Sequence, residues 1–186
     1  MVDVVGLSLL ADKVDKCKKC SLYAGCRGKV FGDIGPNTQV VFVGQCPGED
    51  EDLAGRPFVG KSGQLLRKWI KSAGLTDDQI SIVNILKCYI PNNRDPIESE
   101  KQACSEWIDR QVDLIGCKKL VLLGRVACDH FLSGSGIFDG SILKHVGNVY
   151  PVDGRQFLVF PHPSFVLRGG EHYEVPVDKL KNFGGK

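Results

Sequence analysis

The sequence lacks any apolar run close to the roughly 20 residues that a membrane-spanning helix requires. Its first residues also lack the basic segment and following apolar segment of a secretory signal, so we expect a cytoplasmic protein. Internal repeats and low-complexity tracts are missing as well. The net charge is only +2, so the bulk charge does not indicate a nucleic-acid binder, and any basic face must be local.

The composition is that of a globular protein. The 186 residues are 42% hydrophobic, which predicts one domain, residues 1–186, with ample material for a core. Eight cysteines would suit a small secreted scaffold, but nothing else indicates secretion. In a cytosolic chain, that number is more typical of metal or cluster ligation together with ordinary buried thiols.

The stretch from residue 39 to residue 69 is the most informative part of the sequence for the fold and the binding site. Residues 39–44 are a continuous apolar run, as in a central strand that is buried on both faces. A loop rich in glycine, proline and acidic residues follows, and helical spacing of apolar residues begins near Ser62. A loop at the carboxyl end of a central parallel strand is where open α/β sheets bind their ligands.

The remaining elements alternate between strand and helix patterns. Further strands are predicted at 80–87 and 119–124, and a hairpin at 148–160 with its turn at Asp153-Gly154. Helices are predicted at 8–16, 62–73, 96–115, 126–132 and 177–183. Such alternation predicts an α/β fold with a mostly parallel sheet.

Four cysteines form two pairs. Cys17 and Cys20 have the spacing with which one loop presents two thiolates to one metal centre. Cys88 follows a predicted strand, and Cys104 lies on the next predicted helix. Two pairs suffice for a four-thiolate site, either zinc or an iron–sulfur cluster. Alternatively, Cys88 and Cys104 are buried core thiols, and Cys17 and Cys20 are a chance pair. Cys26 could also replace one of the four ligands.

Residues 55–62, GRPFVGKS, satisfy the phosphate-binding pattern G-x-x-x-x-G-K-[ST]. A phosphate loop follows its strand almost at once, whereas ten residues separate Gly44 from Gly55. Pro57 removes one backbone donor, and Phe58 adds bulk where backbone N–H groups should surround phosphate. We therefore do not interpret this segment as a nucleotide-binding loop.

Four motifs together carry a family resemblance. They are CKKC at 17–20, GQCPGEDEDLAGRPFVGKSGQLL at 44–66, VNILKC at 83–88 with the distal Cys104, and HPSFVLRGG at 162–170. Their order and spacing, from Cys17 to Arg168, resemble the uracil-DNA glycosylase superfamily, specifically its iron–sulfur family 4.

The resemblance implies a three-layer α/β/α sandwich around a four-stranded, mostly parallel sheet. It also implies a [4Fe-4S] cluster on Cys17, Cys20, Cys88 and Cys104, which favours iron over zinc. The expected activity is base-excision repair: hydrolytic removal of uracil, or a related deaminated base, from DNA to leave an abasic site. We expect a monomer that acts on DNA, in the cytoplasm of a prokaryotic-type cell and associated with the nucleoid.

The resemblance assigns the base-binding residues. A base inside a duplex must be flipped into a pocket before it can be read. Phe58 matches the residue that stacks on the uracil, and Asn84 the amide that pairs with its edge. The backbone N–H groups of Gln45 and Cys46 would face a uracil carbonyl oxygen. His162 matches the histidine that hydrogen-bonds uracil O2.

The residues expected to contact DNA lie at two places. A helix N-terminus favours phosphate, and an apolar wedge after the histidine would fill the space left by the flipped base. The first place comprises Lys61 and Ser62; the second comprises Ser164, the wedge residues Phe165, Val166 and Leu167, and Arg168.

One position departs from the family pattern. Family 4 members carry Glu where this chain has Gln45, and family 1 members carry Gln followed by Asp, where this chain has Cys46. A neutral amide can orient water but cannot take its proton. The acidic run 49–52 offers substitutes, and Glu51 matches a second acidic position of the family. The alternatives to a glycosylase are a lesion-binding protein with little turnover, or a cluster protein without base chemistry.

Overall fold

The computed structural model describes residues 1–169 and 174–185. Its helices are α1 (Val4–Asp15), α2 (Glu49–Ala54), α3 (Lys61–Ser72), α4 (Glu98–Ile115), α5 (Arg125–Leu132), α6 (Ile142–His145), α7 (Pro163–Gly169) and α8 (Val177–Gly184). Its strands are β1 (Asp33–Ile34), β2 (Val40–Gly44), β3 (Ile80–Asn84), β4 (Lys119–Leu123), β5 (Val149–Val152) and β6 (Arg155–Phe160). Short 3-10 turns lie at Ser21–Ala24, Asp77–Gln79, Pro91–Asn93 and Ser133–Ser135.

The strands form one mixed sheet in the order β1-β3-β2-β4-β6-β5. The inner four strands are parallel, whereas β1 and β5 pair antiparallel at the two edges. The predicted four-stranded sheet was therefore wrong in number: within the described ranges the sheet has six strands. The two-residue strand β1 lies in a Gly-rich segment and is too short to produce a periodic pattern, and β5 is the first arm of the predicted hairpin.

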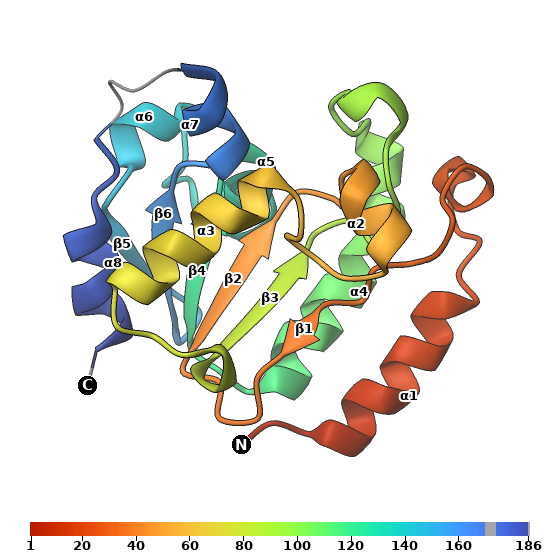
Figure 1. Ribbon diagram of the computed structural model, residues 1–186, viewed down its shortest axis with the longest axis horizontal. Coiled ribbons are helices and arrows are strands. Elements are labelled where there is room, and N and C mark those ends of the chain that lie inside the picture. Colours follow the sequence, from red (N-terminus) through yellow and green to blue (C-terminus); the bar gives the residue numbers. More distant parts are fainter. Residues whose placement is uncertain (170–173, 186) are drawn as a thin grey trace.

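Helices cover both faces of the sheet, giving three layers (Figure 1). Alternate residues of β2 divide between two apolar clusters: Val41 and Val43 pack with α1, α4 and α5, whereas Val40 and Phe42 pack with α3 and α8. All five residues of β2 are buried, because the strand is covered on both faces. The continuous apolar run in the sequence has this origin.

Two segments differ from their predictions. The acidic loop after β2 contains α2, whose first turn carries four acidic side chains near the positive end of the helix dipole. Strand β3 ends at Asn84 rather than at residue 87, because its partner β2 ends at Gly44, directly opposite. Both changes occur at the carboxyl edge of the sheet, where regular pairing stops.

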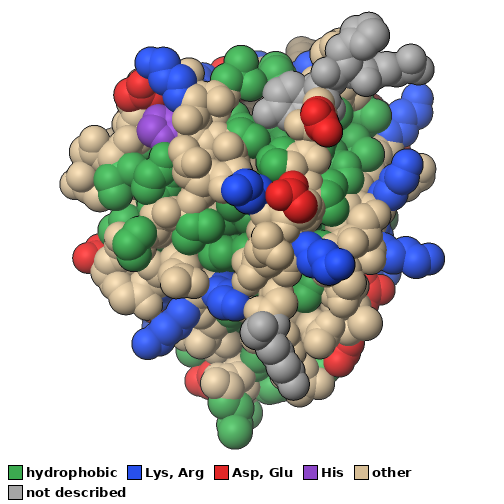
Figure 2. Space-filling model, turned by 90° about the vertical axis from the view of Figure 1, so that its left-hand side faces the viewer, with side chains coloured by type: hydrophobic (Ala, Val, Ile, Leu, Met, Phe, Trp, Pro, Cys, Tyr) green, Lys and Arg blue, Asp and Glu red, His purple; other side chains and the backbone are tan. Residues whose placement is uncertain are grey.

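No helix among the described residues is long and apolar enough to cross a membrane. Figure 2 shows one face of the molecule, on which basic side chains lie dispersed among apolar and acidic ones. This dispersal agrees with the small net charge and leaves any DNA-binding surface to a local group of residues. The expected single domain, monomeric state and nucleoid location remain predictions.

Candidate active site

A pocket of about 350 Å³ lies at the carboxyl edge of the parallel strands. Residues within two positions after the ends of β2, β4 and β6 line it, together with the last residue of β3. Six of the residues expected to read or hydrolyse the base line it together: Gln45, Cys46, Glu51, Phe58, Asn84 and His162. The expected DNA contacts Ser62, Ser164 and Arg168 also line it, whereas Lys61, Val166 and Leu167 do not.

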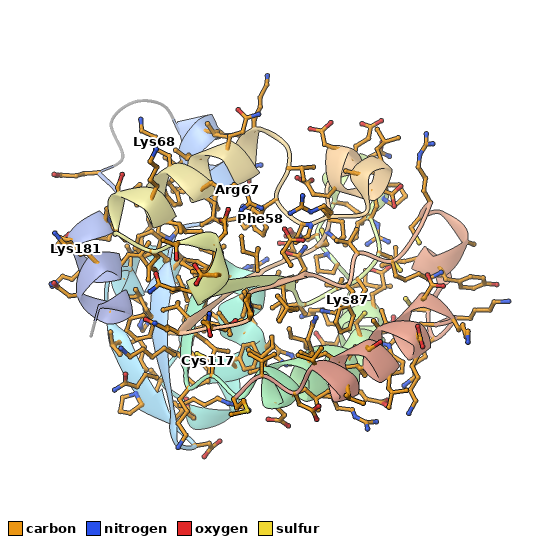
Figure 3. All side chains as sticks on the ribbon, turned by 60° about the horizontal axis from the view of Figure 1, so that its bottom comes forward. Phe58, Arg67, Lys68, Lys87, Cys117 and Lys181 are labelled. Atoms are coloured by element: carbon orange, nitrogen blue, oxygen red, sulfur yellow. The ribbon has the colours of Figure 1, made fainter. Side chains whose placement is uncertain are left out.

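Phe58 is held against the end of β2. Its φ is +53°, in the left-handed region that bulky residues rarely adopt, and its side chain is buried. A Cβ on Gly44 would lie 2.7 Å from the ring atoms Cε2 and Cζ, so the ring packs where only glycine leaves space. In Figure 3 the ring points inward from the loop toward the sheet. Strain of this kind is typical of functional sites.

Asn84 ends β3 opposite Gly44. Its Oδ1 atom is buried, and no hydrogen-bond partner for it exists among the described residues. A Cβ on Gly44 would come within 2.4 Å of this oxygen. An unsatisfied buried acceptor costs about 1–3 kcal/mol, so its persistence at a pocket wall indicates a ligand that supplies the donor.

The main chain around Asn84 is fixed by a buried lysine. Lys87 donates from Nζ to the Asn84 carbonyl oxygen (2.7 Å) and to Gln111 Oε1 (2.6 Å). The Lys87 side chain lies in the interior near α4 (Figure 3). Burial lowers the pKa of Lys87 to about 7. This contact leaves no signal in the sequence, because the apolar run around Lys87 resembles an ordinary strand.

His162 follows β6 and faces the same pocket. Its Nδ1 accepts the backbone N–H of Ser164 (3.2 Å) and pairs with the Ser164 hydroxyl (2.8 Å). Since a backbone N–H can only donate, Nδ1 is the acceptor, and the neutral ring carries its proton on Nε2. Burial, with a smaller contribution from the Arg168 cation, lowers the pKa of His162 to about 4. The ring centroid lies 5.9 Å from that of Phe58.

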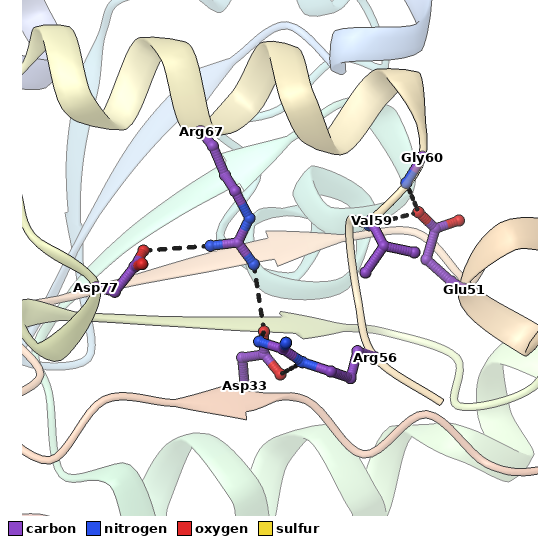
Figure 4. A network of polar contacts seen from close by, with 7 residues as sticks. All are labelled: Asp33, Glu51, Arg56, Val59, Gly60, Arg67 and Asp77. Atoms are coloured by element: carbon purple, nitrogen blue, oxygen red, sulfur yellow. Dashed lines mark hydrogen bonds and ion pairs between the residues drawn. The ribbon is translucent and has the colours of Figure 1, made fainter. Parts of the chain in front are cut away.

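Glu51 binds the backbone of its own loop. Its Oε1 accepts the N–H groups of Val59 and Gly60, both at 2.8 Å, and its Oε2 accepts the N–H of Gly48 at 3.0 Å. Figure 4 shows the first two bonds. Both carboxylate oxygens are therefore engaged in holding together the two ends of the segment that carries Phe58.

A second group of contacts holds the same segment from outside (Figure 4). Arg56 Nη2 lies 2.8 Å from Asp33 Oδ2, and Arg67 bridges Asp33 (3.3 Å) and Asp77 (3.2 Å). These pairs connect the Phe58 loop and α3 to β1. Such partly exposed ion pairs each contribute little to the free energy of unfolding. Here their effect is to fix the position of the Phe58 loop relative to β1.

The start of the loop carries no ionised group. Gln45 forms a side-chain hydrogen bond with Cys46, and burial raises the pKa of the Cys46 thiol to about 12. The thiol is therefore neutral at physiological pH and is not a thiolate nucleophile. Both residues line the pocket and neither supplies a carboxylate.

The wedge residues divide between the surface and the core. Phe165 and Leu167 are 41% and 50% exposed on α7, whereas Val166 packs against the cluster that contains α3. Lys61 begins α3 and is exposed. These residues are chain neighbours of the lining residues Ser62, Ser164 and Arg168, and their contact with DNA remains a prediction.

Asp95 and Arg125 also line the pocket, and neither residue was predicted from the sequence to belong to the site. Asp95 lies in the segment PNNRDP (91–96), which reads as a simple turn cluster. The position of this turn in the chain could have indicated a role in the site, because it follows β3, a parallel strand whose carboxyl end meets the pocket. Gly124 precedes Arg125, and a Cβ there would lie 3.0 Å from His162 Cβ.

The other histidines lie elsewhere. His130 Nε2 lies 2.7 Å from Asp109, and His145 Nδ1 lies 2.7 Å from the Tyr150 hydroxyl. The sequence offers no catalytic setting for these two histidines or for His172, and the contacts of the first two agree with surface or structural roles. His172 lies outside the described residues.

The four candidate metal ligands come from three places in the fold: the end of α1, the segment after β3, and α4. Burial raises the pKa of the Cys88 thiol, with smaller contributions from the neighbouring sulfurs of Cys26, Cys104 and Cys20. Burial also raises the pKa of Cys104, and the sulfurs of Cys20 and Cys17 contribute in the same direction. Trp107 Nε1 donates to the Cys17 sulfur at 3.3 Å, a contact that suits a ligating thiolate.

These thiols do not enclose a single ion. Among residues 1–169 and 174–185, no group of three or more His, Cys, Asp or Glu side chains is arranged to hold one metal ion. A single zinc would bring its sulfurs to roughly 3.8 Å from one another, because Zn–S bonds are about 2.3 Å and tetrahedral. A four-iron cluster holds its thiolates farther apart. The four cysteines are neighbours without closing on one ion, an arrangement that is compatible with the larger group.

Comparisons with known proteins agree with this site. A sequence model of the uracil DNA glycosylase superfamily matches residues 31–181. A type-4 uracil-DNA glycosylase of Sulfurisphaera tokodaii is 43% identical over 87% of this chain and 76% of its own. Type-4 uracil-DNA glycosylases of Thermotoga maritima and Archaeoglobus fulgidus are each 36% identical, over 87% and 94% of this chain and 83% and 91% of their own. This chain therefore belongs to the uracil DNA glycosylase superfamily, within its type-4 group.

Proposed function

We propose that this protein is a hydrolytic DNA glycosylase that removes uracil, or a related deaminated base, from DNA and leaves an abasic site. The observation that carries the proposal is that Asn84, whose Oδ1 has no hydrogen-bond partner in the described part of the chain, lines one pocket with Phe58 and the neutral His162. The type-4 relatives support the same activity.

Recognition follows from the donors and acceptors of the base. Uracil offers a donor at N3 and an acceptor at O4, which match the Oδ1 and Nδ2 atoms of an asparagine amide. Cytosine has the opposite pattern at these two positions, so it would leave Asn84 Oδ1 facing an acceptor. Phe58 supplies the stacking surface for the flipped base. Asn84 thus distinguishes uracil from cytosine by hydrogen bonding and Phe58 contributes affinity.

His162 stabilises the leaving group. Cleavage of the bond between C1′ and N1 leaves an oxocarbenium-like sugar and a uracil anion, whose charge lies partly on O2. The Nε2–H of neutral His162 donates to this oxygen as the charge develops. A pKa of about 4 keeps the ring neutral at physiological pH, so the hydrogen bond strengthens without a proton transfer.

Glu51 has a different role from the one we expected. Its two oxygens accept three backbone N–H groups, which supports a positioning role for the Phe58 loop rather than direct contact with water. Gln45 lines the pocket and can orient water through its amide.

Contacts to DNA are assigned to residues around the pocket. Lys61 and Ser62 lie at the N-terminus of α3, where backbone N–H groups favour phosphate. Ser164 and Arg168 line the pocket on the α7 side and would contact phosphate there. The exposed Phe165 and Leu167 side chains are suited to enter the space left by the flipped base.

A [4Fe-4S] cluster on Cys17, Cys20, Cys88 and Cys104 completes the proposal. Such a cluster, when bound, would supply a cross-link between α1, the segment after β3 and α4. Cys88 lies four residues after Asn84, so the ligand set is positioned to stabilise the backbone around the base-reading amide.

The test is alkaline strand cleavage of a labelled oligonucleotide with one uracil, single-stranded or opposite guanine. We expect wild type to cleave and His162→Gln to be about 10²–10³-fold slower. His130→Gln, a histidine away from the pocket, is the matched control and should cleave at the wild-type rate. Cleavage by His162→Gln at that rate would refute the assignment of the leaving-group donor.

Gln45 favours a second candidate, a lesion-binding protein with little turnover. Such a protein would retain uracil-containing DNA in a mobility-shift assay without producing alkali-labile sites. Wild-type cleavage of every bound oligonucleotide in a single turnover would exclude this alternative.

A further inference from the structure

The pocket needs a group for the attacking water, and the expected ones do not supply it. Gln45 is neutral, the Cys46 thiol is protonated, and both oxygens of Glu51 are engaged by backbone N–H groups. Asp52 accepts the Arg27 N–H with both oxygens and does not line the pocket. Among the described lining residues, the remaining carboxylate is Asp95.

Asp95 lines the same pocket, in the segment between β3 and α4. Its negative charge contributes to the raised pKa of the Cys46 thiol, so the two side chains lie near each other. Family 1 enzymes carry a carboxylate at the position of Cys46. Arg125 Nη2 donates to Asp95 Oδ2 at 3.2 Å. Among the described residues, Oδ1 has no hydrogen-bond partner, and the side chain is 71% exposed, so water reaches it. One oxygen is thus oriented by a cation while the other faces solvent at the pocket.

The segment that carries Asp95 is fixed by its neighbours. Arg94 forms two hydrogen bonds with Glu100, at 2.9 and 2.6 Å, and donates to the Asp95 carbonyl oxygen at 3.0 Å. Glu100 is only 2% exposed and also accepts the Ile97 N–H. A carboxylate on an anchored turn keeps its position, as catalytic groups require.

We propose that Asp95 is the catalytic carboxylate that orients the attacking water and accepts its proton, replacing the Glu that is absent at position 45. This inference rests on the proposed glycosylase function. The bond between C1′ and N1 breaks, and its electron pair leaves with uracil. The water oxygen forms a bond to C1′, and the proton that it loses passes to Asp95 Oδ1. Arg125 bonds to Oδ2 and offsets the repulsion between Asp95 and DNA phosphate.

The test is the single-turnover cleavage rate of a uracil-containing oligonucleotide at saturating protein. Asp95→Asn keeps the size of the side chain and an acceptor for Arg125, so we expect unchanged DNA affinity and cleavage about 10²-fold slower, the lower range for loss of a general base. The matched control is Glu49→Gln, an exposed carboxylate of the acidic run that does not line the pocket. Its rate should equal that of wild type.

Rescue separates a chemical role from a structural one. Gln45→Glu in the Asp95→Asn background restores a carboxylate to the pocket, and its cleavage rate should be at least tenfold higher than that of Asp95→Asn alone. An Asp95→Asn rate within threefold of wild type would overturn the proposal, as would a Glu49→Gln loss equal to that of Asp95→Asn. If wild type and Gln45→Glu both fail to cleave, the proposed glycosylase function itself is wrong. Wild-type cleavage with unaffected Asp95→Asn refutes only the role of Asp95.

Discussion

Replacement of Asn84 by leucine should make the protein more stable while it abolishes activity. The two side chains have the same number of heavy atoms and the same branching, so the change removes polar atoms at nearly constant shape. Asn84 Oδ1 is buried and unpartnered among the described residues. Its removal relieves about 1–3 kcal/mol of desolvation.

The expected result is a free energy of unfolding that rises by about 1–2 kcal/mol, since the bulkier leucine offsets part of the relief. For a chain of this size, each 1 kcal/mol shifts Tm by about 2–4 °C. Uracil excision should be undetectable, because the amide that reads the base is gone. Thermal unfolding monitored by circular dichroism measures the first effect, and oligonucleotide cleavage measures the second.

Ser81→Ala is the matched control on the same strand. Ser81 is equally buried, but its hydroxyl lies 2.6 Å from Thr38 Oγ1 and accepts the Gly35 N–H. Its removal should destabilise the protein by about 0.5–1.5 kcal/mol, the opposite sign. If Asn84→Leu destabilises the protein as Ser81→Ala does, Asn84 Oδ1 has a hydrogen-bond partner in the free protein. The inference that this oxygen lacks a donor until the base binds would then be wrong.

Three further predictions follow from the same structure. Glu51→Gln should lower the free energy of unfolding by about 1–3 kcal/mol, because the amide replaces one acceptor oxygen by an NH2 donor that would face a backbone N–H. Glu49→Gln should change the free energy of unfolding by less than about 0.5 kcal/mol. Equal effects of the two variants in denaturant titrations would contradict this prediction. His162 has a folded pKa of about 4, below its ordinary 6.5, so the unfolded chain binds its proton first and stability should fall as pH drops from 6.5 to 4. A smaller acid-induced loss in His162→Gln than in wild type, measured by urea titration, would agree, and identical profiles would not. Cys88→Ala should lose iron and the absorbance near roughly 400 nm, whereas the buried core thiol Cys128 can be replaced by alanine without that loss; unchanged iron in Cys88→Ala would remove it from the ligand set.

Much of the sheet could be predicted because burial on both faces leaves a clear pattern. The strands β2 and β4 have continuous apolar runs, and α3 and α5 follow them with helical spacing. The hairpin of β5 and β6 was also predicted, with its turn at Asp153-Gly154. The two-residue β1 and the one- to two-turn helices α2, α6 and α7 were missed, because segments this short carry too little periodicity to distinguish them from loops.

The sequence by itself determined the family, the longer helices and strands, and the base-binding residues that line the pocket, because these depend on local motifs and on where each strand ends. Tertiary structure decided what each of those residues is able to do. From the sequence, Glu51 was a candidate for the carboxylate that activates water, but its two oxygens accept three backbone N–H groups. Asp95 belonged to a simple turn cluster in the sequence, but it lines the pocket and only its Oδ2 is bonded to Arg125. The physical reason is that the availability of a carboxylate depends on which donors surround it in space, and those donors come from segments far apart in the chain.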